Sequence, residues 1–599
     1  MSPRHFPVLL LMLTLLSGCG GGSADSASSS ASGGTAATVP GEPGGVTVTA
    51  GDSSVSVAFS VPTSTGGAAI TRYTASCTGG GATRTGTGSG SPIDVTGLTN
   101  GTTYGCSVTA TNSAGTGSAS TTGSVTPAAA SSTYNPLWIP PALEGTATNG
   151  VSTFNLSLAA SSKQMMSGPK TVTYGYNGSD FWGPTLILNK GTQSRMVLQN
   201  NLAEATTTHW HGLLVTGAVD GGPHQMIAPG TTWSTPAFTV KNQAATYWYH
   251  PHLHGATQKH LTLGAGGLII VRDADEAALA LPRTYGTDDI PLMLTSRRFT
   301  TTNGTTNQFQ TSNTAYGDYL LANGVLNAEV TLPHQIVRLR LLNAEIEREY
   351  NIGFGDNRTF FVIGSDGGLM SAPLAVTRLI MAPGERYEIL VDLNGDTVGG
   401  SLDLKAYNGA DSGLSFGFAG LEPATSGNFG SLLNYTTFNL LHIKVGATTA
   451  SPITTVPASL VTNTFPAAAD ATTSRAINIT GGLNGAAFSF NNVLYNYGTI
   501  NQTVRTGATE SWTVNAGNIF SHSFHIHGVQ FKLVARNGSA ANIQNYEKGW
   551  KDTLYVPLQA SATFVARFDD TADSTLPFMY HCHMSNHEDE GLMGQFVVQ

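Results

Sequence analysis

Short runs in which apolar and polar residues alternate recur along most of the chain. Clear examples are Val55–Phe59, Ile70–Cys77 and Val108–Asn112. Because successive side chains of a strand point to opposite faces, this pattern predicts strands with one buried face. Long stretches with the helical period are scarce. The chain is therefore predicted to be all-β and to consist of several sandwich domains joined by many turns.

The alternating runs within residues 43–127 form one group. They resemble a fibronectin type III domain, with Tyr104 in the place of the tyrosine-corner residue. Cys77 and Cys106 fall on runs that would be neighbouring strands of that sandwich. A disulfide formed in an oxidising compartment and two buried thiols are both consistent with this placement. The segment carries no group of catalytic side chains, and we interpret it as a spacer or adhesion module.

Three later segments repeat one theme, in which turn residues flank Val- and Leu-rich runs. Their landmarks are Asn177-Gly178 with Ala228-Pro229-Gly230, Asn323-Gly324 with Ala382-Pro383-Gly384, and Asn491-Asn492 with Val556-Pro557. The repeat length is roughly the 150 residues expected of one sandwich domain. We therefore predict three further domains, at residues 136–278, 279–450 and 451–599.

The first residues have the features of an export signal. Residues 1–18 contain the apolar run Val8–Leu16, which is too short for a permanent membrane span. The run is followed by Ser17-Gly18-Cys19, which looks like a bacterial lipoprotein cleavage box, so Cys19 is the expected site of lipidation. An ordinary cleaved signal is the alternative, and no Arg-Arg pair supports a twin-arginine signal. Residues 19–42 are rich in Gly, Ser, Ala and Thr and predict a flexible linker.

Composition and charge narrow the possible partners. The net charge is −9, and only 28 of the 599 residues are Lys or Arg, which argues against nucleic-acid binding. The export signal predicts a lipid-anchored protein of the bacterial cell envelope that faces the periplasm or the exterior, with secretion as the alternative. Contact with a membrane is expected only through the lipid anchor.

Four His-x-His pairs and one Cys carry the candidate chemistry. The pairs are His209/His211, His250/His252, His525/His527 and His581/His583. On a strand, the members of a pair share one face, and Cys582 between His581 and His583 points to the other. His522 has the opposite parity to His525 and His527, and His587 follows Cys582 by five residues. One Cys with two His is a blue-copper arrangement, and the eight paired imidazoles suffice for a three-metal cluster.

These motifs, in this order, resemble the multicopper oxidases, a family that includes laccases, bilirubin oxidases and bacterial cuprous oxidases, over residues 136–599. The resemblance implies three cupredoxin-like Greek-key β-sandwich domains after the fibronectin-like one. It also implies four copper ions per chain, with the middle domain free of copper because Glu349-Tyr350-Asn351 stands where the other domains have a His pair. The implied ligands are His522, Cys582 and His587 for type 1 copper; His209 and His525 for type 2; and His211, His250, His252, His527, His581 and His583 for the type 3 pair.

Further residues have roles that the same resemblance implies. Asp220 matches an acidic residue near the type 2 copper, and Glu588 matches a proton donor to reduced oxygen; a structural carboxylate is the alternative for each. Leu592 stands where some members have an axial Met, so we expect no axial ligand. His224, His254 and His260 match no ligand position, and the stretch Trp550-Lys551-Asp552 is interpreted as structural.

The electron donor is less well specified than the metal sites. Cuprous oxidases carry a Met-rich insertion and an acidic residue four positions before the type 1 His, whereas residues 395–515 here lack Met and that position is Asn518. A laccase-like oxidase of phenolic or aromatic donors that uses O2 is therefore expected, with oxidation of Cu(I), Fe(II) or Mn(II) as the alternative. A surface copper-binding or adhesion protein is the alternative of another class. A copper nitrite reductase would not need His on both sides of Cys582.

Overall fold

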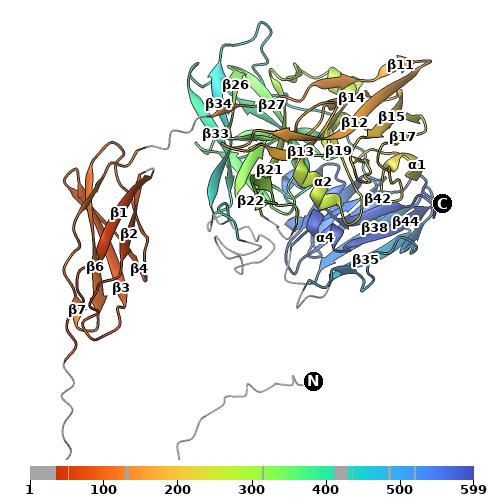
Figure 1. Cartoon of the computed structure of the whole chain (residues 1–599). Helices are drawn as coiled ribbons and strands as arrows, with labels where there is room; N and C mark the ends of the chain where they lie inside the picture. Colours follow the sequence, from red (N-terminus) through yellow and green to blue (C-terminus); the bar gives the residue numbers. More distant parts are fainter. Residues whose placement is uncertain are drawn as a thin grey trace, which may run out of the picture. The chain divides into compact units, whose positions relative to one another are not determined.

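The computed structural model describes residues 36–51, 53–128, 134–312, 316–409, 430–434, 436–482, 487–517 and 521–599. The chain divides into two compact units, Met1–Ser132 and Thr133–Gln599 (Figure 1). The expected signal at residues 1–18, Cys19 and Asn518 lie outside the described residues. Among the described residues, no helix is long and apolar enough to cross a membrane.

The first unit is a sandwich of two antiparallel sheets, ordered β1-β2-β5 and β4-β3-β6-β7, with β8 also paired to β6. The Tyr104 hydroxyl accepts a hydrogen bond from the Thr99 N–H (3.0 Å), which is the contact of a tyrosine corner. Cys77 and Cys106 lie directly opposite each other on β3 and β6 and are joined by a disulfide. The strands are β1 (Gly44–Gly51), β2 (Ser54–Ser60), β3 (Arg72–Gly79), β4 (Ala82–Gly88), β5 (Ile93–Thr96), β6 (Tyr104–Asn112), β7 (Gly115–Thr116) and β8 (Gly123–Val125).

The second unit contains three pairs of sheets, each pair enclosing a hydrophobic core. The first sandwich joins the sheet β10-β14-β20-β19-β16 to the sheet β11-β12-β15-β17, with β13 and β18 at its side. Its elements are β10 (Ala142–Glu144), β11 (Thr146–Thr148), β12 (Val151–Lys163), β13 (Thr171–Tyr176), β14 (Thr185–Asn189), β15 (Gln193–Asn200), β16 (His209–His211), α1 (Gly217–Asp220), β17 (Thr232–Ser234), β18 (Phe238–Thr239), β19 (Ala245–His250), α2 (Thr257–Leu263), β20 (Gly267–Arg272) and α3 (Ala274–Ala277).

The second sandwich joins the sheet β25-β24-β21-β27-β32-β29-β30 to the sheet β31-β28-β33-β34-β26-β9, with β22-β23 as a separate hairpin. Its strands are β9 (Asn135–Pro136), β21 (Asp289–Arg297), β22 (Phe299–Thr302), β23 (Thr305–Phe309), β24 (Tyr319–Ala322), β25 (Val325–Leu326), β26 (Ala328–Pro333), β27 (Ile336–Asn343), β28 (Tyr350–Phe354), β29 (Phe360–Ser365), β30 (Gly368–Val376), β31 (Leu379–Met381), β32 (Arg386–Asp392), β33 (Ser401–Tyr407) and β34 (Thr437–Gly446).

The third sandwich, blue in Figure 1, joins the sheets β36-β35-β38-β42-β40 and β37-β44-β43-β39-β41. Its elements are η1 (Ala468–Asp470), β35 (Thr473–Thr480), β36 (Ser489–Phe490), β37 (Gln502–Val504), β38 (Thr509–Ala516), β39 (His522–Ile526), β40 (Phe531–Arg536), η2 (Ala540–Asn542), η3 (Asn545–Lys548), β41 (Thr553–Val556), β42 (Ser561–Arg567), β43 (Phe578–Cys582), α4 (Ser585–Asp589) and β44 (Met593–Val598). The described chain is thus predominantly β, and the expectation of an all-β fold is confirmed.

Two segments cross the boundaries expected from the sequence repeats. Strand β9, at the start of the segment assigned to the first repeat, pairs with β26 of the second sandwich. Ile453 and Leu460, assigned to the third repeat, also bond to the second sandwich: the Ile336 N–H donates to the Ile453 carbonyl (2.8 Å), and the Leu460 N–H donates to the Ser371 carbonyl (2.9 Å). These connecting segments tie the second sandwich to its neighbours.

Candidate metal centre

The two candidate sites lie on opposite faces of one sheet in the third sandwich. Strands β39 and β43 are antiparallel, with Phe524 opposite Cys582 and His525 opposite His581. Directly paired residues share a face, so Cys582 and Phe524 face the core of the third sandwich. His525 and His581 face the other way, toward the first sandwich. The alternation of side chains expected from the sequence therefore places the two sites on opposite faces of the same sheet.

The Cys582 site is compact and buried. The Cys582 sulfur lies 3.6 Å from His522 Nδ1 and 3.7 Å from His587 Nδ1, and all three side chains are at most 3% exposed. His587 comes from the short helix α4 rather than from a strand. The Phe488 ring lies 4.2 Å from the His587 ring, centroid to centroid, and Leu592 packs in the same core as Cys582. One sulfur and two imidazole nitrogens thus converge in an apolar surrounding.

The eight paired histidines form a second buried cluster. Strand β16 pairs with β19, which sets His209 opposite His250, and these two strands meet β39 and β43 across the sandwiches. The ligand atoms lie within 4.8 Å of one another in three groups: His209, His525 and His527; His211, His250 and His583; and His252, His527 and His581. The structure therefore brings together every histidine that the sequence placed in the cluster.

Most of these rings are fixed through Nδ1, which leaves Nε2 free to face the cluster. His209 Nδ1 bonds to the Asp220 carbonyl (2.9 Å), His250 Nδ1 to the Pro251 carbonyl (2.9 Å), and His525 Nδ1 to the Asp552 carbonyl (2.8 Å). The Nε2 atoms of His209, His250 and His525 are buried without a hydrogen-bond partner among the described residues. Uncompensated buried nitrogen atoms are costly unless they bind something, so this donor set fits copper ions.

His211 is turned the other way. Its Nε2 lies 3.2 Å from both Asp552 Oδ1 and Thr553 Oγ1, whereas its Nδ1 is buried and unpartnered among the described residues. Asp552 is held by Arg386 of the second sandwich through two ion-pair contacts of 2.7 and 2.6 Å. Asp552 therefore orients a candidate ligand, which is a more specific role than the structural one expected from the sequence. Asp552 directly precedes β41, which pairs with β39, and this position in the sequence could have indicated the contact with His211.

The two predicted carboxylates both contact candidate ligands. Asp220 Oδ2 accepts a hydrogen bond from His527 Nδ1 (2.8 Å). Glu588 lies between two histidines, with Oε1 3.1 Å from His252 Nδ1 and Oε2 3.3 Å from His581 Nδ1. Thr257 also donates a hydrogen bond to Glu588 Oε1 (2.7 Å). Both carboxylates are almost completely buried, which places them beside the cluster rather than at the surface.

Burial dominates the electrostatics of both sites. It lowers the pKa of His250, His525 and His522 well below the usual value for histidine, and that of His587 to about 3. These imidazoles are therefore neutral at neutral pH, which is the form that binds metals. Burial also raises the pKa of the Cys582 thiol. Metal binding at this site must therefore displace a proton.

Among the described residues, the second sandwich supports the cluster and contributes none of the candidate ligands. A Cβ atom on Gly384, whose φ is +85°, would lie 2.7 Å from the His583 ring, so only glycine lets this turn approach the cluster. Glu347 and Glu349 are buried near the Cys582 site, and Glu349 accepts a hydrogen bond from Ser521 (2.9 Å). Burial raises the pKa of Glu347 to about 8 and that of Glu349 to about 7.

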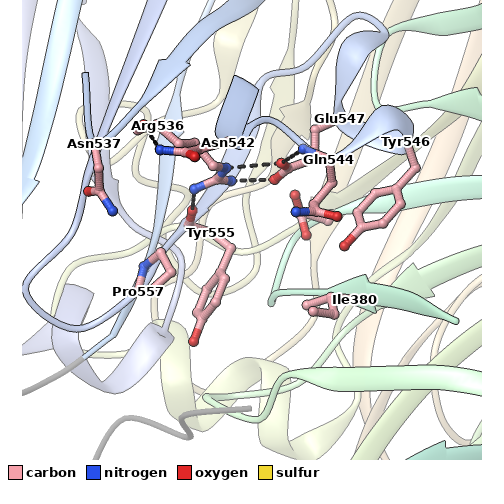
Figure 2. A pocket seen from close by; sticks show the side chains of 10 residues that line it. Ile380, Arg536, Asn537, Asn542, Gln544, Tyr546, Glu547, Tyr555 and Pro557 are labelled. Atoms are coloured by element: carbon pink, nitrogen blue, oxygen red, sulfur yellow. Dashed lines mark hydrogen bonds and ion pairs between the residues drawn. The ribbon is translucent and has the colours of Figure 1, made fainter. Parts of the chain in front are cut away.

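A pocket of about 290 Å³ lies where the second and third sandwiches meet (Figure 2). Tyr546 and Tyr555 line it, and Figure 2 shows Arg536 paired with Glu547 beside them. Its lining residue Glu385 bonds to Lys551 Nζ (2.8 Å). Lys551 also pairs with Asp366, which pairs with Arg386, the partner of Asp552. The pocket therefore adjoins the ion-pair network that supports the cluster and contains none of the predicted ligands.

Comparisons with known proteins agree with this geometry. Sequence models of multicopper oxidases match residues 159–276, 283–400 and 468–599. The chain is 33% identical to the cell division protein FtsP of Photorhabdus laumondii over 433 residues, which cover 72% of this chain and 85% of that protein. The chain belongs to the multicopper oxidase family. A fibronectin type III model matches residues 41–126, so the multicopper oxidase segment follows a fibronectin type III domain.

Other proteins to which the chain is similar carry different names. The chain is 30% identical to the multicopper oxidase mco of Staphylococcus haemolyticus, over 75% of this chain and 89% of that protein. A solved structure of a laccase-like multicopper oxidase from Ochrobactrum sp., described as active towards lignin model compounds and lignosulfonate, is 31% identical. It covers 78% of this chain and all of that chain, with a TM-score of 0.67. The fold expectation, one fibronectin-like sandwich and three cupredoxin-like sandwiches, is confirmed.

Proposed function

We propose that the chain is an oxidase that couples one-electron oxidation of phenolic, aromatic or related donors to the reduction of O2 to water. The observation that supports this most is the arrangement of Cys582. Its sulfur lies beside the ring nitrogens of His522 and His587. Its neighbours in the chain, His581 and His583, belong to the histidine cluster on the other face of the sheet. A copper-storage or adhesion protein would not need a cysteine ligand placed in the chain between two histidines of the cluster.

The proposed ligand set follows the clusters. His522, Cys582 and His587 hold type 1 copper, and His209 and His525 hold type 2. The type 3 pair is held by His211, His250 and His583 on one side and by His252, His527 and His581 on the other. The bound ions, four per chain, would supply one-electron acceptance at the Cys582 site and oxygen reduction at the cluster.

The protein's own groups orient the ligands and handle protons. Asp220 fixes His527 and lies beside His209, and Glu588 lies between His252 and His581. Both carboxylates are within reach to hold or pass a proton at the cluster. We propose that Asp220 acts near the type 2 ligands and that Glu588 supplies protons for the reduction of oxygen.

For the electron donor and the cellular location we propose only a class. The Met-free stretch 395–515 favours phenolic or aromatic donors over dedicated Cu(I) oxidation, with Fe(II) or Mn(II) as alternatives. Relatives named as cell division proteins raise a second role, in cell division. We propose a lipid anchor at Cys19, a location at the cell envelope, and a separate ligand for the fibronectin-like domain.

Oxygen uptake tests the proposal directly. Copper-loaded protein should be blue, contain about four copper ions, and consume oxygen with at least one donor among phenols, bilirubin, Cu(I), Fe(II) and Mn(II). The Cys582→Ser variant should lose the blue band and donor-driven uptake but keep about three copper ions, because the cluster ligands are unchanged. Full turnover by this variant, or copper binding without uptake from any donor by the unaltered protein, would contradict the proposal.

A further inference from the structure

Four aromatic side chains that belong to neither candidate site form a connected series. The ring centroids of His254 and Tyr495 are 4.8 Å apart, those of Tyr495 and Tyr497 are 5.2 Å apart, and those of Tyr497 and His224 are 5.2 Å apart. These spacings are those of aromatic rings in contact. His224 and His254 are among the histidines for which the ligand pattern has no position.

The inner end of the series lies beside Glu588, which contacts the candidate ligands His252 and His581. His254 follows the candidate ligand His252 by two residues. The loop after His254 is hydrogen-bonded to α4. Asp589 accepts hydrogen bonds from the N–H groups of Gly255 (2.8 Å) and Thr257 (3.2 Å). Tyr495 packs against His254, and its hydroxyl is buried without a hydrogen-bond partner among the described residues. This hydroxyl therefore has no structural hydrogen bond to explain its presence.

The outer end is exposed but fixed. Tyr497 is 43% exposed, and Leu494, three residues before it, is 54% exposed. The Gln595 side chain donates hydrogen bonds to the carbonyls of Asn496 (3.0 Å), Tyr497 (3.1 Å) and Thr499 (2.8 Å), and it also bonds to His224. An exposed tyrosine is thus held at one place by three backbone contacts.

We propose that Tyr497, Tyr495 and His254 form an electron route from the protein surface to the histidine cluster, with Tyr497 as a surface radical site. The inference rests on the proposed function, because the oxidant is the copper cluster after it has reacted with oxygen. The route would supply an electron to the cluster when the Cys582 site has none to deliver.

The step balances as follows. Tyr497 loses one electron, which passes through the rings of Tyr495 and His254 to the cluster, and its phenolic proton leaves to water because the ring is exposed. The resulting tyrosyl radical takes a hydrogen atom from an external phenol, which restores Tyr497 and leaves a phenoxyl radical. The external phenol is thus the final reductant, and the cluster ligands are spared from oxidation.

Electron paramagnetic resonance tests the route. Copper-loaded protein is given fewer electrons than dioxygen needs, mixed with oxygen, and frozen. The unaltered protein should show an organic radical that ring-deuterated tyrosine narrows. Tyr497→Phe and Tyr495→Phe should each lose the signal from the surface tyrosine, since phenylalanine keeps the packing but cannot form the radical. Steady-state oxygen uptake with excess donor should be unchanged, which also shows that both variants fold.

Tyr319→Phe is the matched control, because Tyr319 is equally exposed, at 42%, but lies on β24 of the second sandwich. This variant should keep the radical. A radical of full intensity in both Tyr495→Phe and Tyr497→Phe, or no radical in an unaltered protein that consumes oxygen normally, overturns the inference and leaves the proposed function intact. A protein that binds copper but consumes no oxygen overturns both.

Discussion

At the scale of single residues, Leu592 lies next to Cys582, whose N–H donates a hydrogen bond to the Leu592 carbonyl (3.1 Å). It is fully buried and packs in the same core as Cys582. Met593 is paired with His581 across β43 and β44, so its side chain lies on the cluster face and not on the Cys582 face. A leucine cannot donate to a metal, and an apolar surrounding disfavours the more highly charged Cu(II) state. The type 1 potential should therefore be high for the family.

Leu592→Met should lower that potential by at least about 60 mV, the shift that corresponds to a tenfold change in a one-electron equilibrium. Oxidation of donors with high potentials should slow in parallel. The measurement is a redox titration of the blue band, with Met593→Leu as the control that should leave the potential unchanged. A large shift confined to Met593→Leu would show that Met593 reaches the copper instead.

A second residue-scale prediction concerns the buried carboxyl of Glu347, whose pKa burial raises to about 8. This pKa exceeds the value in the unfolded chain. The contribution of the protonated Glu347 carboxyl to the free energy of unfolding is therefore fully present below about pH 4.5 and is lost as the pH rises through 8. Glu347→Gln should therefore leave the melting temperature of the copper-free protein unchanged at pH 4.5 and raise it at pH 8. The gain at pH 8 should be of the order of 4 kcal/mol, because the pKa is raised from 4.5 to about 8. A variant that is equally or less stable at pH 8 would show that Glu347 is charged and compensated there.

At the scale of elements, strand alternation accounts for the two faces of the sheet on which the candidate ligands lie, and the remainder depends on contacts between distant segments. Parity alone separated Cys582 from His581 and His583, because it is a local property of a strand. The reversal of His211 was not predictable in this way. It depends on Asp552, more than 300 residues away, and on Arg386 from the second sandwich. Likewise, the short helix that carries His587 is set by packing rather than by a helical pattern.

The contact between Asp552 and His211 gives the element-scale prediction. Asp552→Asn removes the charge that pairs with Arg386 and weakens the hold on His211 Nε2. Loss of such a supporting contact typically lowers metal affinity about 10–100-fold. Copper analysis should show fewer cluster ions, while the blue band persists because the Cys582 site lies on the other face of the sheet.

Asp569→Asn, which alters an exposed ion pair with Arg567, is the control and should keep all the copper. If Asp552→Asn retains the full copper content and an unchanged cluster spectrum, the orientation of His211 is set by packing alone.

At the scale of the whole molecule, the fibronectin type III unit and the multicopper oxidase unit are separately compact. The first has its own core and its own disulfide, and every candidate copper ligand lies in the second. Such units can fold alone when few contacts cross their boundary. The three sandwiches of the second unit are different, because the ligands come from the first and third and the support comes from the second.

Removing residues 20–127 from a soluble form of the protein should therefore leave copper content and oxygen uptake nearly unchanged. Removal of the second sandwich would strip the cluster of Arg386 and Gly384 and should abolish copper binding at the cluster. Metal analysis and oxygen uptake of the shortened protein provide the measurement, with circular dichroism to establish that it is folded. Loss of copper from a folded protein that lacks only residues 20–127 would mean that the fibronectin type III unit stabilises the metal sites, and its function would then have to be sought in the oxidase rather than in adhesion.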